Sequence, residues 1–139
     1  MDMKEENIRF SKRSYPDEEF DPDIVYVTEG NTFEVLKYMK ELGIFKYIKK
    51  LARDKSKDLI YIGSSAGAMI AGDDIMLAKD FDSNTVGLYD YTSLGLFEGA
   101  VVPHYTEEQL KLYIESTEKH ILERYYTIYS VSNDEMLEL

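Results

Sequence analysis

A serine flanked by small residues is the first feature that could do chemistry. Ser65 lies in the segment Gly63-Ser64-Ser65-Ala66-Gly67, which fits the Gly-x-Ser-x-Gly pattern of a nucleophile elbow. In that motif the serine occupies a strained turn between a strand and a helix, and the two glycine positions must lack bulk. An apolar segment precedes the motif and another follows it, so we predict that Ser65 is a nucleophile. The alternative interpretation is a strand–helix contact that needs small residues only for packing.

A serine hydroxyl is a weak nucleophile until a base removes its proton, and the sequence holds two histidines. His104 follows Pro103 at the end of an apolar segment, whereas His120 lies inside a predicted helix. The carboxyl ends of parallel strands converge at one edge of a sheet. We therefore predict that His104 is the base and that His120 is an ordinary helix residue.

A third group should orient the imidazole of the base and stabilise its charged form. Acidic residues are too numerous in this sequence for composition to select one. Asp80 and Asp82 lie in a long polar loop, and Asp134 and Glu135 follow the last predicted strand. All four remain open as the orienting acid, and each is equally consistent with solubilising surface charge.

Backbone N–H groups near Ser65 could hold the negative oxygen that forms during acyl transfer. The N–H of Ala66 begins the helix after Ser65, where the helix dipole favours negative charge. Gly30 follows an earlier strand and would present its N–H without a side chain in the way. We predict that Gly30 and Ala66 form an oxyanion hole; the alternative for Gly30 is a turn that begins a helix.

The order of predicted elements explains how these residues could meet. Apolar patterns predict strands at 23–28, 59–62, 97–105 and 126–131. They also predict helices at 33–42 and 44–53, a helix that begins at 66, and a long helix that begins at 106. This alternation predicts an α/β fold, a parallel sheet with helices on both faces. Residues 23–139 form a single domain in this interpretation, and residues 1–22 form an acidic leader or irregular arm. Gly30-Asn31, Ser65 and His104 all follow predicted strands.

Composition excludes several other classes of function. The net charge is −11, which opposes binding to nucleic acid or to anionic membrane surfaces. The chain has no cysteine, no long apolar segment and a polar start, so we expect a cytoplasmic protein without a membrane span. Neither Asp73-Asp74 nor Asp80-Phe81-Asp82 has the spacing of a calcium loop, and no glycine-rich phosphate loop is present. No metal or cofactor is predicted.

Three motifs, in this order, resemble the peptidase E (aspartyl dipeptidase) family of serine peptidases. They are Gly30-Asn31-Thr32-Phe33, Gly63-Ser64-Ser65-Ala66-Gly67-Ala68 and Pro103-His104-Tyr105. The resemblance implies a class I glutamine amidotransferase-like fold, which is flavodoxin-like with three layers. It also implies Ser65 as nucleophile, His104 as base, Gly30 and Ala66 as oxyanion donors, and Asn31 in substrate binding. Within this resemblance Asp80 is the preferred acid, and the competing position after the last strand falls near Asn133, beside Asp134.

The sequence departs from the family pattern at several positions. Glu29 replaces the first glycine of the family's Gly-Gly-Asn, and no arginine follows His104 at the spacing of the family's substrate-reading arginine. Family members carry further elements before the strand at 23–28, so the resemblance implies a fold shortened at its N-terminus. That strand would then lie at an exposed edge, and we expect a second copy to pair with it in a homodimer.

These observations predict a serine hydrolase that cleaves short peptides through an acyl-enzyme on Ser65. Two alternatives remain open. One is an inactive relative that keeps the fold and serves as a binding or assembly module, for which the shortened sheet and Glu29 are the arguments. The other is an ester-cleaving or acyl-transfer activity at the same serine.

Overall fold

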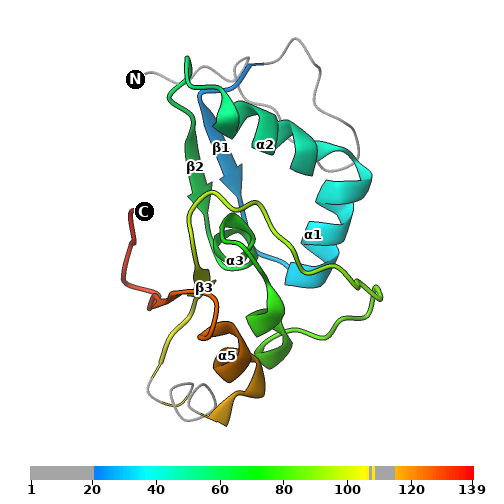
Figure 1. The fold of residues 1–139 in the computed structure, drawn as a ribbon, viewed down its shortest axis with the longest axis vertical. Helices are drawn as coiled ribbons and strands as arrows, with labels where there is room; N and C mark the ends of the chain where they lie inside the picture. The colour runs from blue at the N-terminus through cyan, green and yellow to red at the C-terminus, as the bar shows by residue number, and fades with distance from the viewer. Residues whose placement is uncertain (1–20, 107, 109–114) are drawn as a thin grey trace.

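Parallel strands alternate with helices in the computed structural model, which describes residues 21–106, 108 and 115–139 (Figure 1). The predicted arm at 1–22 lies almost wholly outside these residues. The elements are, in chain order, β1 (Ile24–Val27), α1 (Thr32–Glu41), α2 (Ile44–Arg53), β2 (Ile60–Gly63), α3 (Ala66–Ala71), the 3-10 helix η2 (Met76–Asp80), β3 (Ala100–Val102), α5 (Thr117–Leu122) and β4 (Ile128–Ser130). This order confirms the predicted α/β class.

The described strands form two parallel pairs. β1 pairs with β2, with Val27 opposite Gly63, and β3 pairs with β4, with Val102 opposite Ser130. Helix α3 packs against β1, β2 and β3, so it joins the two pairs. The carboxyl ends of β2 and β3 therefore both lie near α3, and these are the ends that carry Ser65 and His104.

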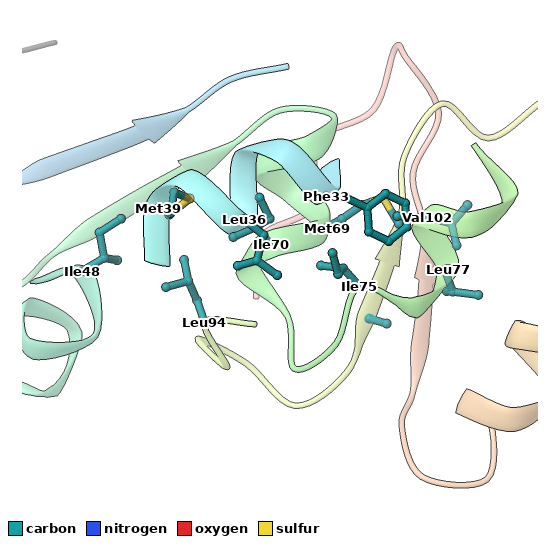
Figure 2. Packing of buried hydrophobic residues seen from close by; sticks show 12 residues of the cluster. Phe33, Leu36, Met39, Ile48, Met69, Ile70, Ile75, Leu77, Leu94 and Val102 are labelled. Carbon is teal, nitrogen blue, oxygen red and sulfur yellow. The ribbon is translucent and has the colours of Figure 1, made fainter. Parts of the chain in front are cut away.

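A buried apolar cluster holds α1, α3, η2 and β3 together. Helix α1 contributes Phe33 and Leu36, α3 contributes Ile70, η2 contributes Leu77 and β3 contributes Val102, and all five are fully buried. Figure 2 shows these side chains meeting between the elements. The apolar positions of α1 recur at helical spacing, which explains why this segment forms an amphipathic helix with one face on the core.

The predicted polar loop forms η2 and a long connection to β3 that lies along α1 (Figure 1). Lys37 of α1 donates a hydrogen bond to the backbone oxygen of Val86 (3.1 Å), and Lys40 forms an ion pair with Asp90 (3.1 Å). Asn84 closes a turn by bonding the N–H and the carbonyl of Leu88. The loop is therefore attached along the length of α1.

The long helix predicted from residue 106 is wrong as a continuous element. Residues 107 and 109–114 lie outside the described part, but the backbone is extended at Ser116 (φ −65°, ψ 121°), and α5 begins after it. The Ser116 hydroxyl accepts a hydrogen bond from the N–H of Lys119 (3.1 Å). A serine side chain that caps a helix in this way favours a new helix start over continuation of the previous one.

None of the helices in the described ranges is both long enough and apolar enough to cross a membrane.

Candidate active site

Ser65 occupies a strained turn between β2 and α3. Its backbone has φ 52° and ψ −114°, in a region that residues with side chains rarely adopt. Strand β2 ends at Gly63 and α3 begins at Ala66, so the turn is as short as a nucleophile elbow requires. Strain of this kind costs about 1–3 kcal/mol and persists only where the surroundings impose it.

The two glycines of the motif are required because backbone passes directly beside them. A Cβ at Gly67 would lie 2.0 Å from the carbonyl oxygen of Val27, and a Cβ at Gly63 would lie 2.5 Å from the oxygen of Gly67. The N–H of Ser64 donates to the same Val27 oxygen (3.0 Å). Close packing between β1, β2 and α3 therefore imposes the elbow, and Ser65 as nucleophile stays a prediction.

His104 reaches Ser65 from the end of β3. Its Nε2 lies 2.9 Å from the Ser65 Oγ, although the two residues are 39 positions apart. His104 is exposed and has a positive φ of 56°, so the chain turns sharply after Pro103 and directs the ring toward the elbow. The N–H of Tyr105 donates to the carbonyl of Val131 (3.1 Å), which keeps the end of β3 beside the chain after β4.

The other ring nitrogen of His104 contacts an amide. Nδ1 of His104 lies 2.6 Å from Oδ1 of Asn133. An acceptor at this point favours a proton on Nδ1 and leaves the Nε2 lone pair directed at the Ser65 hydroxyl. Asn133 therefore fixes the ring orientation and tautomer that a general base needs, but it supplies no negative charge.

The structure does not bring Asp80 to His104. Oδ2 of Asp80 accepts a hydrogen bond from the buried hydroxyl of Ser116 (2.6 Å), so Asp80 fastens η2 to the cap of α5. Asp82 bonds to Thr32, and Glu135 accepts from the N–H of Ser132 (3.0 Å), which lowers the pKa of Glu135. No carboxylate in the described residues has a hydrogen bond to His104, and the partner found is Asn133.

Two backbone N–H groups near the elbow have no hydrogen-bond acceptor among the residues that the structure describes. One belongs to Ala66, the first residue of α3, and the other to Gly30, which follows β1 with φ 143°. The contact between Ser64 and Val27 places the carboxyl end of β1 beside the elbow. These are the two donors that the sequence predicts for an oxyanion hole.

Asn31 has a structural part in the same turn. Its Oδ1 accepts from the N–H groups of Phe33 (3.1 Å) and Glu34 (3.2 Å), and therefore caps α1. Its Nδ2 donates to the carbonyl of Ser83 (2.9 Å). Both ends of the amide have partners within the chain, and a contact between Asn31 and substrate stays a prediction.

The carboxylates of Asp73 and Asp74, considered above as cation ligands, accept hydrogen bonds from the backbone. Asp73 accepts from the N–H of Gly99 (2.9 Å), and Asp74 accepts from the N–H of Met76 (2.6 Å). Burial raises the pKa of Asp74, and the charges of Asp90 and Asp73 add to this effect. Across the described ranges, no three metal-binding side chains lie together.

Known proteins with similar sequences are peptidases. The family model for peptidase family S51 matches residues 6–139. An uncharacterized peptidase of Listeria monocytogenes, Lmo0363, is 37% identical over 122 residues, which cover 83% of this chain and 55% of that protein. Peptidase E of Citrobacter koseri is 35% identical over 86 residues, which cover 62% of this chain and 35% of that protein.

A solved structure shows the same relationship in three dimensions. A crystal structure described as a candidate peptidase E protein of Listeria monocytogenes EGD-e aligns with a TM-score of 0.59 and 32% identity. The alignment covers 80% of this chain and 52% of that one. The chain thus spans about half the length of the curated peptidases to which it aligns over more than 100 residues.

Proposed function

The chain belongs to peptidase family S51, and on this premise we propose that it is a serine peptidase that cleaves short peptides through an acyl-enzyme on Ser65. One observation carries the proposal: His104 Nε2 lies 2.9 Å from the hydroxyl of a serine held on a strained elbow. A nucleophile within hydrogen-bond reach of a base, which a third group orients, is the arrangement that nucleophilic catalysis requires.

In the proposed reaction His104 moves the protons, Ser65 carries the acyl group, and two backbone N–H groups hold the oxyanion. Nε2 of His104 takes the proton of the Ser65 hydroxyl as Oγ attacks the peptide carbonyl carbon. The N–H groups of Ala66 and Gly30 stabilise the oxyanion that forms, and His104 then gives its proton to the departing amine. Water, deprotonated by His104, then attacks the acyl carbon. The bond from that carbon to Ser65 Oγ breaks, His104 returns the proton to Oγ, and the carboxylic acid product leaves.

Asn133 orients the base in this mechanism but brings no negative charge to it. Its oxygen holds the imidazole in the required tautomer, as asparagine does in the Cys-His-Asn arrangement of papain-like proteases. Without a negative charge beside it, the imidazolium that forms during attack is stabilised less than beside a carboxylate. The uncharged partner of His104 also favours the second candidate function, a binding module that keeps the fold without turnover.

Turnover measurements separate the two candidates. A panel of dipeptides and tripeptides with free amino termini, together with p-nitrophenyl acetate, would be incubated with the wild type, Ser65→Ala and Ser64→Ala. Ser64 is the matched control because its hydrogen bonds to the described residues involve its backbone alone. We expect turnover by the wild type and Ser64→Ala and none by Ser65→Ala. A folded wild type that hydrolyses nothing on the panel would favour the binding module, and ester turnover alone would favour an esterase.

A further inference from the structure

A carboxylate from the long loop holds the first turn of α1 beside the elbow. Oδ2 of Asp82 accepts two hydrogen bonds from Thr32, one from its N–H (2.9 Å) and one from its hydroxyl (2.7 Å). Thr32 is only 2% exposed, so this contact reaches into the interior. The proposed mechanism gives Asp82 no part, and its partner Thr32 is two residues after Gly30 in the chain.

A second bond from the same loop strengthens the attachment. The carbonyl of Ser83 accepts a hydrogen bond from Nδ2 of Asn31 (2.9 Å). Two consecutive loop residues therefore hold the two residues that follow Gly30. Gly30 itself has φ 143°, a conformation open to glycine, and its N–H is bonded to no acceptor among the described residues. The direction of that N–H thus depends on its neighbours.

The same threonine also touches the nucleophile helix. The Thr32 hydroxyl oxygen lies 3.8 Å from the sulfur of Met69, a buried residue of α3. The hydroxyl is therefore placed between the Asp82 carboxylate and the helix that begins immediately after Ser65. This contact couples the position of the Gly30 turn to that of the elbow.

We propose that Asp82 is a positioning residue that directs the Gly30 N–H toward the oxyanion. The inference rests on the proposed function, because it assigns Gly30 its part in that reaction. Hydrogen bonds to an ionised carboxylate are stronger than those to a neutral acceptor, and a negative charge at the N-terminus of α1 is favoured by the helix dipole. An asparagine at position 82 keeps one acceptor oxygen and should therefore restore part of the effect.

The chain offers a matched control in Asp90. Asp90 attaches the same loop to the other end of α1, through its exposed ion pair with Lys40 (3.1 Å). Asp90→Ala removes one negative charge and one attachment of the loop, as Asp82→Ala does. It leaves the contacts of the loop with the residues after Gly30 in place. A loss specific to position 82 therefore separates positioning from general loop stability.

The test is steady-state hydrolysis of p-nitrophenyl acetate by the wild type, Asp82→Ala, Asp82→Asn and Asp90→Ala. Removal of a whole oxyanion donor costs about 100- to 1000-fold in kcat, so a misdirected donor should cost about 10- to 100-fold. We expect this loss in kcat for Asp82→Ala, with KM changed by less than about twofold and Asp82→Asn intermediate. Asp90→Ala should stay within about twofold of the wild type.

A spectroscopic measurement keeps this inference separate from the proposed function. In the amide NMR spectrum, we expect the Gly30 resonance to move in Asp82→Ala and to stay in Asp90→Ala. An unmoved Gly30 resonance, or equal losses of kcat in Asp82→Ala and Asp90→Ala, would overturn the inference. A moved resonance in a protein whose wild type has no turnover would support the positioning of Gly30 and contradict the proposed function alone.

Discussion

Asn133 holds Nδ1 of His104 at 2.6 Å, at the point where a carboxylate is expected in a serine hydrolase. The contact joins the turn after β4 to the turn after β3, and it leaves Nε2 directed at Ser65. The orienting group is therefore neutral. This single difference has consequences for rate and for pH dependence.

Replacing Asn133 by aspartate should raise the rate of acyl transfer. A carboxylate at this position stabilises the imidazolium that forms as Ser65 attacks, and we expect an increase of about tenfold in kcat/KM for p-nitrophenyl acetate. Because the neutral ring is the base, the acid limb of the pH profile should move to higher pH by about one unit. Asn133→Ala should lose activity instead, and a profile that stays in place in Asn133→Asp would contradict this role.

Replacing Ser65 by glycine should abolish activity and stabilise the protein relative to Ser65→Ala. Alanine keeps the positive φ of 52° and its strain, whereas glycine adopts this conformation freely. Strain of about 1–3 kcal/mol is offset in part by the greater freedom of glycine in the unfolded chain, which leaves a difference of about 1 kcal/mol. Urea unfolding at pH 7 measures it, and an alanine variant as stable as the glycine variant would show that the turn is unstrained.

Replacing Gly67 by alanine should destroy the elbow. The added Cβ would lie 2.0 Å from the Val27 oxygen, so β1 and α3 must separate, at a cost of about 3 kcal/mol or more. Gly87→Ala is the control, because its Cβ would meet nothing within 4 Å and only its φ of 62° is unfavourable, at about 1 kcal/mol. Both free energies of unfolding come from urea titration. Equal losses in the two variants would mean that backbone contact does not dictate the motif.

The meeting of Ser65 and His104 could be predicted because its sequence signals are local, whereas their roles as nucleophile and base stay predictions. The glycines at 63 and 67 indicate a close approach of the backbone. His104 follows an apolar strand, and the carboxyl end of that strand is expected to lie near that of β2 in a parallel arrangement. The α/β class follows from the same alternation of elements. The resemblance to the peptidase E family is likewise confirmed by the family match and the similar structure.

The partner of His104 could not be predicted in the same way. The identity of this partner depends on the three-dimensional course of the turn after β4 and of the loop after η2. Hydrophobic periodicity in the sequence predicts helices and strands but not the course of such loops. Within the family resemblance the alternatives are Asp80 and a position near Asn133, and the requirement for an acid favours Asp80. An amide oxygen can, however, also accept the hydrogen bond from Nδ1–H. A second signal was available at Ser116, where a capping residue inside an apolar helical pattern marks a helix start.

Replacing Asp74 by asparagine should stabilise the protein most at neutral pH. Burial raises the pKa of Asp74 in the folded state, so the ionised group opposes folding at pH 7. As the pH falls through that raised value, the folded wild type takes up the proton before the unfolded chain does, and the wild type gains stability. The advantage of Asp74→Asn should therefore shrink between pH 7 and about pH 4.

Urea unfolding of Asp74→Asn at several pH values provides the measurement, with Asp58→Asn as the control. Asp58 is exposed, so its replacement reports the effect of removing one charge from a chain of net charge −11. Asparagine at 74 keeps the oxygen that accepts from the Met76 N–H (2.6 Å). An advantage that grows toward acid pH would reverse the sign of this prediction.

The most direct measurement is the rate at which a fluorophosphonate forms an adduct, with the modified residue located by mass mapping of peptides. The reagent requires an activated serine, so the wild type should be labelled at Ser65. His104→Ala should be labelled about 100-fold more slowly, and His120→Ala, which alters the exposed histidine of α5, should match the wild type. A folded wild type that stays unmodified at Ser65, or one labelled as fast without His104, would contradict the account.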